Sequence, residues 1–391
     1  MTVREATLPE SSNFALRIPQ DGWLGLLLWI PTLQSIPQAI FGAALICALL
    51  RLPKTPRVPT IDVIFLCLIM AASSLNYIYG MAAAPDGSVD RSPYFAAYIA
   101  TYLIARVVTR TDLRVAIYLI AVEALFVYLE FALRVNTIFT FNPEYRHLSI
   151  AALYFTRPFG LSDASSVIGY KLFMALLLLD FTEVAGRKRR LLQLVLLPAF
   201  VLVFNRTALV AYAIYLACRW LIDRVQRGPK VRDVVVALIG GVALYYTYAR
   251  VSDIIWSQFN RGKGSLDLSY RDVIWANFLD FYQKVPLLGN GSSKYYAYLP
   301  DYGTFEHAHN SYLELLASNG IIISAIYLAW FVLRAKWERI IYIFPIAIYS
   351  FTQYGFFWGI SFVDVLFLSI TIFDLSAAKS RPVHATSEVI R

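Results

Sequence analysis

Long apolar runs follow one another along most of this 391-residue chain. A bilayer core about 30 Å thick needs roughly 20 apolar residues in one helix. The pattern predicts helices at residues 60–80, 93–109, 113–134, 164–182, 191–205, 207–223, 234–250, 312–333, 340–355 and 357–375. The stretch 22–50 is too long for one straight span, and Pro31 and Pro37 predict two short helices there. The expected fold is therefore an all-α polytopic membrane protein with about 12 transmembrane helices.

Clusters of basic residues separate these runs. They are RLPKTPR (51–57), RVVTRTDLR (106–114), GRKRR (186–190), RWLIDRVQRGPKVR (219–232), RAKWER (334–339) and KSR (379–381). Short loops rich in Lys and Arg remain on the cytoplasmic side of a membrane, and these clusters fall on alternate loops. The segments 135–163, 205–206 and 251–311 are then external. If 22–50 crosses twice, both termini are inside; if it crosses once, the N-terminus is outside.

The longest polar segment, residues 251–311, is expected to form a large external loop between the ninth and tenth helices. Its aromatic, Pro and Gly residues predict a packed loop with short helices, for example at 269–283. We see no repeat and no soluble domain in the sequence. Residues 1–391 are therefore expected to form a single integral membrane domain, with the loop 251–311 carrying part of any site.

Composition agrees with a membrane protein and narrows its chemistry. Hydrophobic residues make up 58% of the chain and charged residues 16%, compared with roughly 25% charged in soluble domains. The net charge of +9 then indicates topology and contact with anionic lipids rather than nucleic acid. The cysteines, the carboxylates and the Gly-rich stretches show no metal or nucleotide motif, so we expect no cofactor and no metal.

Three arginines stand out in the external segments. Arg157 lies in TRPFGLSDASS, Arg206 lies between two helices with almost no loop, and Arg271 lies in SYRDVIW. The planar guanidinium group matches the oxygens of a phosphate, so three converging arginines would suit a pyrophosphate. Alternatively, each side chain extends to lipid head groups or pairs with a local acid such as Asp163 or Asp272.

One histidine, His309, directly precedes a long apolar run. Asn310 is a suitable N-cap for the helix that follows, and the positive end of a helix favours a neutral imidazole and attracts phosphate. A neutral histidine there can accept a proton from a hydroxyl nucleophile. Alternatively, it is simply hydrogen-bonded in the membrane interface. Other candidates lack this position: Glu306, His307, His147 and His384.

Charged residues also occur within the apolar runs, where they are costly in lipid and need protein partners. Glu123 and Lys171 can form a pair, and Glu130 lies four residues before Arg134, the spacing of a helical ion pair. Asp364 is a further buried candidate. Two interpretations stay open, a proton or ion path and a set of structural pairs.

Four motifs in this order resemble segments of the O-antigen ligase/O-antigen polymerase superfamily of bacterial inner-membrane glycosyltransferases. HAHNSYLELLASNGI (307–321) resembles H-N-x-Y/F-L-x-x-L-x-x-x-G, and RPFGLSDAS (157–165) resembles an external R-x-x-G segment. FNRTALVAY (204–212) is similar to S/N-R-T-a-l-l, and residues 270–295 are similar to R-x-x-x-W followed by P-x-x-G-x-G. The second segment continues as LSDASS, where the family often has Pro-Asn.

The resemblance implies a metal-independent, inverting glycosyltransferase in the bacterial inner membrane with its active site facing the periplasm. The donor would be an undecaprenyl-pyrophosphate-linked oligosaccharide and the acceptor a sugar hydroxyl. His309 would be the catalytic base. The residues that would bind pyrophosphate are Arg157, Arg206 and Arg271, and the supporting residues are Gly160, Asn310 and Tyr312.

Three functions remain open at this point. A polymerase would join repeat units of an exopolysaccharide or O-antigen, with a flippase and a chain-length regulator of the same pathway as partners. A ligase would move the glycan to lipid A-core or to protein. A polysaccharide transporter or flippase would show repeated halves and charges along a path, and we find no repeat.

Overall fold

The computed structural model describes most of residues 22–372. The positions outside the description are 1–21, 35, 37, 56, 84–94, 140–156, 185, most of 229–270, 293, 300–302, 306, 358–360 and 373–391. The helix predicted at 234–250 lies mostly outside the described residues.

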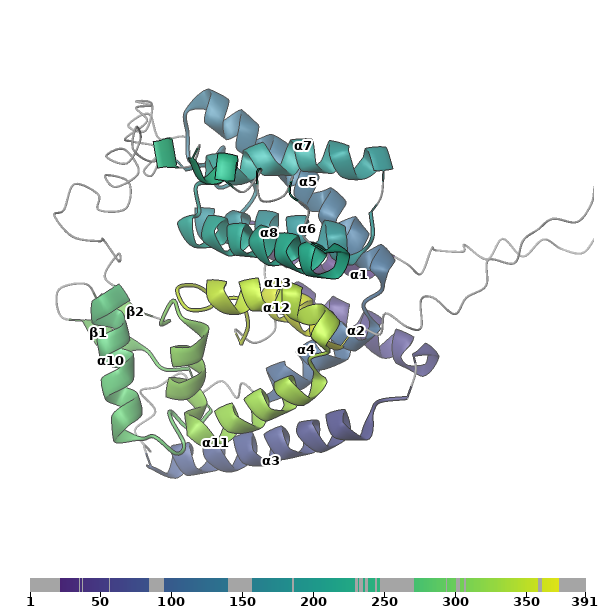
Figure 1. The fold of residues 1–391 in the computed structure, drawn as a ribbon. Coiled ribbons are helices and arrows are strands. Elements are labelled where there is room, and N and C mark those ends of the chain that lie inside the picture. The colour runs from purple at the N-terminus through teal and green to yellow at the C-terminus, as the bar shows by residue number, and fades with distance from the viewer. Residues whose placement is uncertain are drawn as a thin grey trace, which may run out of the picture.

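The described part of the chain is mostly helical, as the apolar pattern predicts (Figure 1). Its α-helices are α1 (Trp23–Trp29), α2 (Phe41–Arg51), α3 (Thr60–Ala83), α4 (Phe95–Val107), α5 (Arg110–Leu133), α6 (Ser165–Phe181), α7 (Gly186–Val203), α8 (Arg206–Arg227), α10 (Arg271–Lys284), α11 (Ser311–Arg334), α12 (Trp337–Tyr349) and α13 (Phe362–Ile372).

The predicted break within residues 22–50 is confirmed. Helix α1 passes into a 3₁₀ turn, η1 (Ile30–Thr32), and a second 3₁₀ turn, η2 (Gln38–Ile40), leads into α2. Pro31 lies in the first of these turns, where its missing N–H costs no helical hydrogen bond. Proline thus divides this apolar stretch into two short helices.

Three described helices, α3, α5 and α11, are long and apolar enough to cross a membrane by length and composition. Several others are shorter apolar helices, among them α2, α4 and α13. The structure therefore supports a helical membrane protein, while the number of twelve crossings stays a prediction.

Helices α6 and α13 lie at the centre of the bundle. Nearly every residue of α6 is buried, and so are most residues of α13, which is the pattern of a helix surrounded by others. Helix α5 packs against α1, α6 and α7, while α12 packs against α8 and α11 against α3.

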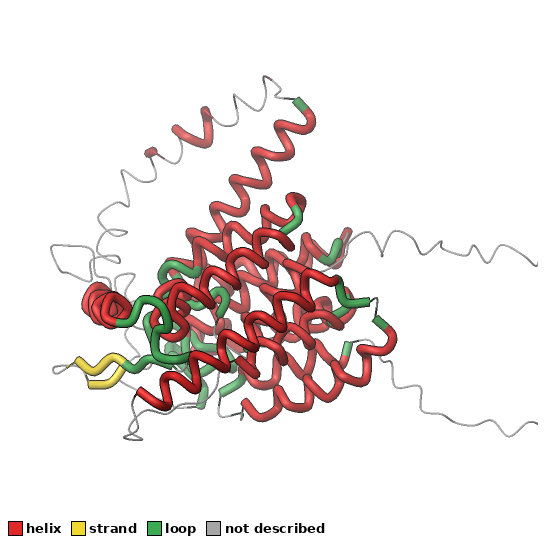
Figure 2. Tube along the Cα trace, turned by 90° about the horizontal axis from the view of Figure 1, so that it is seen from below, coloured by secondary structure: helices red, strands yellow, loops and turns green. Residues whose placement is uncertain are grey.

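One end of the bundle carries α10 and a hairpin of two short antiparallel strands, β1 (Ala297–Leu299) and β2 (Gly303–Phe305) (Figure 2). We call it the α10 end. Helix α10 agrees with the short helix predicted near 269–283. The hairpin was not predicted, because three-residue strands leave too short a pattern to identify.

The opposite end of the bundle collects basic clusters from separate loops. Ion pairs hold them to acidic side chains: Arg51–Asp112, Arg110–Glu183, Arg189–Asp180 and Arg219–Asp180. Four of the predicted basic clusters thus lie on one face of the described fold, while the cluster 379–381 lies outside the described residues.

Helix α11 is broken at Gly320, although the sequence predicts one continuous helix there. Gly320 has φ 68° and ψ −178°, and an added Cβ would lie 2.3 Å from the carbonyl oxygen of Leu287. The loop from Pro286 to Ser292 enters the break. The Ile321 N–H donates to the Pro286 carbonyl at 2.9 Å, and the Ser292 N–H donates to the Ser318 carbonyl at 2.8 Å. The loop therefore replaces helical hydrogen bonds that the break removes.

Candidate active site

His309 lies in the coil before α11, at the α10 end of the bundle. The Oδ1 atom of Asn310 accepts hydrogen bonds from the N–H groups of Tyr312 at 2.9 Å and Leu313 at 3.1 Å. The predicted N-cap is thus confirmed. His309 has φ 49°, a left-handed conformation that a non-glycine residue adopts only when its surroundings enforce it.

The imidazole of His309 is kept neutral. Burial, together with the nearby charges of His307 and Arg271, lowers its pKa to about 3, while the Gln353 side chain acts in the opposite direction. The expected direction is thus confirmed, with burial as the main cause. A bound anion near Arg271 would offset part of this shift, because negative charge raises the pKa of a histidine.

Arg157 and Arg206 lie within electrostatic reach of each other. Burial, with a smaller contribution from the positive charge of Arg206, lowers the pKa of Arg157 to about 10. Arg206 begins α8 directly after its N-cap Asn205, in the tight turn that the sequence predicts. Two half-buried cations repel each other, and an anion bound beside them would relieve that repulsion.

Arg271 lies on the His309 side of the site. It is the first residue of α10, and its charge acts on His309 and on Tyr354. It also acts on Tyr349, whose hydroxyl is hydrogen-bonded to Asn205, the neighbour of Arg206. Tyr349 therefore connects the two groups, so that the predicted base and arginines from separate segments share one neighbourhood.

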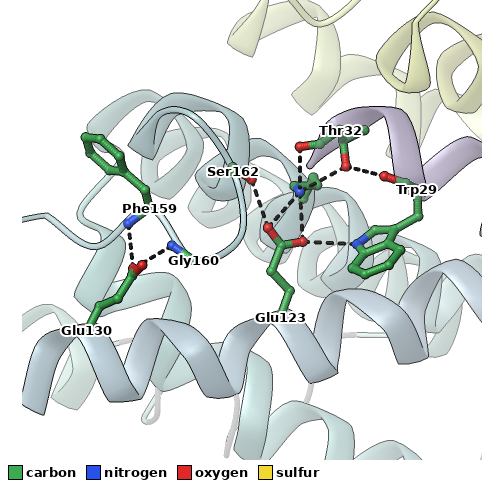
Figure 3. A network of polar contacts seen from close by, with 8 residues as sticks. Trp29, Thr32, Glu123, Glu130, Phe159, Gly160 and Ser162 are labelled. Atoms are coloured by element: carbon green, nitrogen blue, oxygen red, sulfur yellow. Dashed lines mark hydrogen bonds and ion pairs between the residues drawn. The ribbon is translucent and has the colours of Figure 1, made fainter. Parts of the chain in front are cut away.

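The loop that carries Arg157 is fixed by glutamate carboxylates of α5 (Figure 3). The Oε2 atom of Glu130 accepts the N–H groups of Phe159 at 2.9 Å and Gly160 at 2.6 Å. Gly160 has φ 62°, and a Cβ there would lie 3.3 Å from the Cγ of Glu123. Glycine thus permits the close approach of this loop to α5, and Glu130 binds these amides in addition to that of Ile138.

Glu123 and Lys171 form the ion pair that the sequence suggests. Each carboxylate oxygen lies 2.7 Å from the Lys171 Nζ, and both side chains are almost completely buried. Ser162 donates to Glu123 at 2.8 Å, and Trp29 donates to it at 3.0 Å. The pair therefore ties the Arg157 loop to α1 and α6, which favours the structural interpretation.

Asp364, the remaining charged candidate of the apolar runs, is buried in the first turn of α13. Its Oδ2 atom accepts the Ser361 hydroxyl at 2.7 Å, and the N–H of Asp364 donates back to that hydroxyl oxygen at 3.1 Å. This reciprocal arrangement satisfies the start of α13. Asp364 thus has a local role at a helix terminus.

A cavity of about 420 Å³ opens beside His309. Its polar and charged lining within the described residues comprises Thr32, Asp163, Ser166, Lys171, His307, His309, Gln353, Ser361 and the tyrosines 170, 349 and 354. The three arginines are not in this lining. His309 therefore lines this cavity and also lies within the electrostatic reach of Arg271. In the part of the chain that the structure describes, no group of three or more metal-ligating side chains occurs.

Tyr312 points away from this cavity. Its hydroxyl donates to the Ala347 carbonyl at 3.0 Å, and its ring packs against Phe351 and Phe356. Its contacts thus fix α11 against α12. Glu306, His147 and His384 lie outside the described residues.

Sequence reasoning did not identify Glu314 and Tyr354 as parts of the site. Tyr354 accepts the N–H of His309 at 2.9 Å, and Glu314 accepts the N–H of Ala308 at 3.0 Å. A signal for Glu314 was present, because a carboxylate in an apolar helix needs a partner. Tyr354 lies far along the chain in an ordinary aromatic segment.

One comparison with known proteins gives a match. Residues 191–328 match the family described as O-antigen ligase. This range contains Arg206, Arg271 and His309, while Arg157 and Gly160 precede it. No curated protein and no solved structure matches the chain. This segment of the chain, which runs from α7 into α11, is therefore similar to that family.

Proposed function

We propose, on the premise that residues 191–328 form an O-antigen ligase family domain, that this protein is a glycosyltransferase with an undecaprenyl-pyrophosphate-linked donor. It transfers the glycan to a sugar hydroxyl and joins repeat units of an exopolysaccharide or O-antigen. The observation that supports the proposal is that Arg157 and Arg206 lie within electrostatic reach of each other, as do Arg271 and His309. Arginines from separate segments can bind a diphosphate, and a neutral histidine can activate a sugar hydroxyl that attacks the carbon bonded to it.

In this reaction the acceptor oxygen forms a bond to the anomeric carbon, and the bond from that carbon to the pyrophosphate oxygen breaks. His309 takes the proton of the attacking hydroxyl. The arginines stabilise the negative charge that develops on the departing undecaprenyl pyrophosphate. Attack from the face opposite the leaving group inverts the anomeric centre. Guanidinium groups supply the positive charge, so the proposed reaction needs no metal.

The proposal places this reaction at the outer face of the bacterial inner membrane. His309 lies at the α10 end, and the basic clusters lie at the opposite end of the described fold. Basic loops remain in the cytoplasm, so the site would face the periplasm, together with the loop 251–311. Anionic lipids would contact the basic face.

Purified protein in detergent tests the function directly. It is mixed with undecaprenyl-pyrophosphate-linked oligosaccharide and excess EDTA, with no membrane and no ion gradient. We expect longer lipid-linked chains by gel or mass spectrometry. A transporter or flippase would give no product, and loss of product in EDTA alone would contradict metal independence.

The identity of the acceptor distinguishes a ligase from a polymerase. In a strain that lacks the protein, a missing polymerase leaves single repeat units on the carrier, and a missing ligase leaves full-length chains there. Transfer to lipid A-core or to protein by the purified enzyme would replace the polymerase proposal. A flippase and a chain-length regulator are the partners that the polymerase role would require.

Arg206→Lys tests the pyrophosphate role. Lysine keeps the charge but loses the planar pair of donors, so the transfer rate should fall by about 10- to 100-fold, the value of one charge-assisted hydrogen bond. Arg227→Lys is the matched control, because Arg227 lies on the same helix in an exposed pair with Asp223. We measure the rate and the KM for the lipid-linked donor. An Arg206→Lys variant with wild-type values would remove Arg206 from the site.

A further inference from the structure

The proposed reaction does not explain why the backbone at His309 adopts a left-handed conformation. His309 is a non-glycine residue at φ 49°, and this conformation determines where its ring points. Such a conformation persists when neighbouring groups over-determine it. Those groups act on the two peptide bonds that directly precede His309, on either side of Ala308.

Three side chains from three segments hold this part of the backbone. Glu314 Oε2 accepts the Ala308 N–H at 3.0 Å. The indole Nε1–H of Trp275 donates to the Ala308 carbonyl at 2.8 Å. Tyr354 Oη accepts the His309 N–H at 2.9 Å. Every polar group of the backbone from Ala308 N–H to His309 N–H is thereby satisfied.

Glu314 and Tyr354 also contact each other. The Tyr354 hydroxyl donates to Glu314 Oε2 at 3.4 Å, which turns its lone pairs toward the His309 N–H. Glu314 is 5% exposed and lies one helical turn after the N-cap Asn310. A buried carboxylate in an apolar helix is costly. Two of the partners of Glu314, the Ala308 N–H and the Tyr354 hydroxyl, lie at this backbone segment, and the third is Ser318, one turn further along α11.

We propose that Glu314 and Tyr354 are positioning residues that hold His309 in its left-handed conformation and so keep the imidazole at the cavity that it lines. The inference rests on the proposed function, since it assigns a role toward the base of that reaction. Neither side chain is required to touch the reacting atoms. Trp275 fixes the same peptide from α10.

Tyr354→Phe tests the inference most directly. It removes only the oxygen that accepts the His309 N–H, so kcat should fall by up to about 10²-fold, as for a misplacement of about 1 Å, while the KM for the lipid-linked donor stays the same. Tyr102→Phe is the matched control. It also removes a buried tyrosine hydroxyl bonded to a carboxylate, that of Asp62 at 2.7 Å, away from His309, and kcat should stay at the wild-type value.

Glu314 provides a rescue test. Glu314→Gln keeps an oxygen that can accept the Ala308 N–H and should retain most of kcat, whereas Glu314→Ala should lose it to the extent of Tyr354→Phe. If Tyr354→Phe fails to fold, Trp275→Phe serves instead, because it releases the same peptide from the other side. Thermal unfolding of each purified variant is recorded beside its kinetics.

The outcomes distinguish a failure of the proposed function from a failure of the positioning role. If the wild-type protein and the control transfer no glycan, the proposed function is wrong. If the wild-type protein is active and Tyr354→Phe keeps the wild-type kcat, only the positioning role is wrong. Equal losses in Glu314→Gln and Glu314→Ala, or an effect on KM alone, would likewise overturn the positioning role.

Discussion

Replacement of His309 by alanine is expected to lower the rate of glycan transfer by about 10²- to 10⁴-fold, the range for loss of a general base. The arginines remain in place, so donor binding should persist and the loss should appear in kcat. Because His309 lies in a coil and caps no helix, the variant should remain folded and inserted. The measurement is chain growth by the purified variant, together with its thermal unfolding.

His307→Ala is the matched control for this prediction. The ring of His307 lies 4.1 Å from that of His309, between centroids, and lines the same cavity. It lacks the position directly before the N-cap, so its loss should leave most of the rate. An active His309→Ala variant beside an inactive His307→Ala variant would exchange the two assignments.

The second large effect is expected at the buried pair of Glu123 and Lys171. Lys171→Met leaves the Glu123 carboxylate buried without its cation, and removal of one partner of such a pair costs about 3–5 kcal/mol of unfolding free energy. The double variant Glu123→Gln/Lys171→Met removes both charges at similar volume and should recover much of this stability. Denaturant unfolding in detergent measures all three proteins.

The same variants decide between the two interpretations of the buried charges. A structural pair predicts that the double variant is both stable and active. A proton or ion path predicts that it is stable but inactive. Glu183→Gln is the control, because the Glu183 side chain is 65% exposed in its pair with Arg110, and an exposed pair contributes about 0–1 kcal/mol.

Features that depend on neighbouring residues in the chain were predictable from the sequence. The hydropathy pattern located most of the described helices within a few residues, Pro31 indicated the break after α1, and Asn310 indicated the start of α11. The tight turn at Arg206 also follows from its two flanking apolar runs. In each case the residues that determine the feature lie within about one helical turn of each other, so their spacing in the sequence is enough to predict it.

Features that depend on long-range contacts were not predictable in this way. Gly320 stands inside an apolar run, and hydropathy gives no signal that a distant loop will enter the helix there. Glu130 was expected to pair with Arg134, yet it accepts backbone amides from the Arg157 loop. The partners of its carboxylate belong to a loop whose position cannot be predicted from the sequence. Residue spacing within one helix gives no information about such contacts between segments.

The site shows the same division. His309 was predictable because its setting is local, whereas Tyr354 acts on it from a separate loop. The sequence suggested that the arginines converge, but their grouping, Arg157 with Arg206 and Arg271 with His309, depends on the packing of segments that lie far apart in the chain.

The contact between the loop from Pro286 to Ser292 and the break in α11 limits which segments of this protein can be replaced. Gly289 and Gly320 bring two backbones together with no side chain between them; a Cβ on Gly289 would lie 2.5 Å from the Gly320 nitrogen. The backbone conformation of each segment therefore has to match that of the other. A chimaera that imports only one of them from another enzyme would place mismatched backbones at the crossing, so the loop and the helix are exchangeable only as a matched pair.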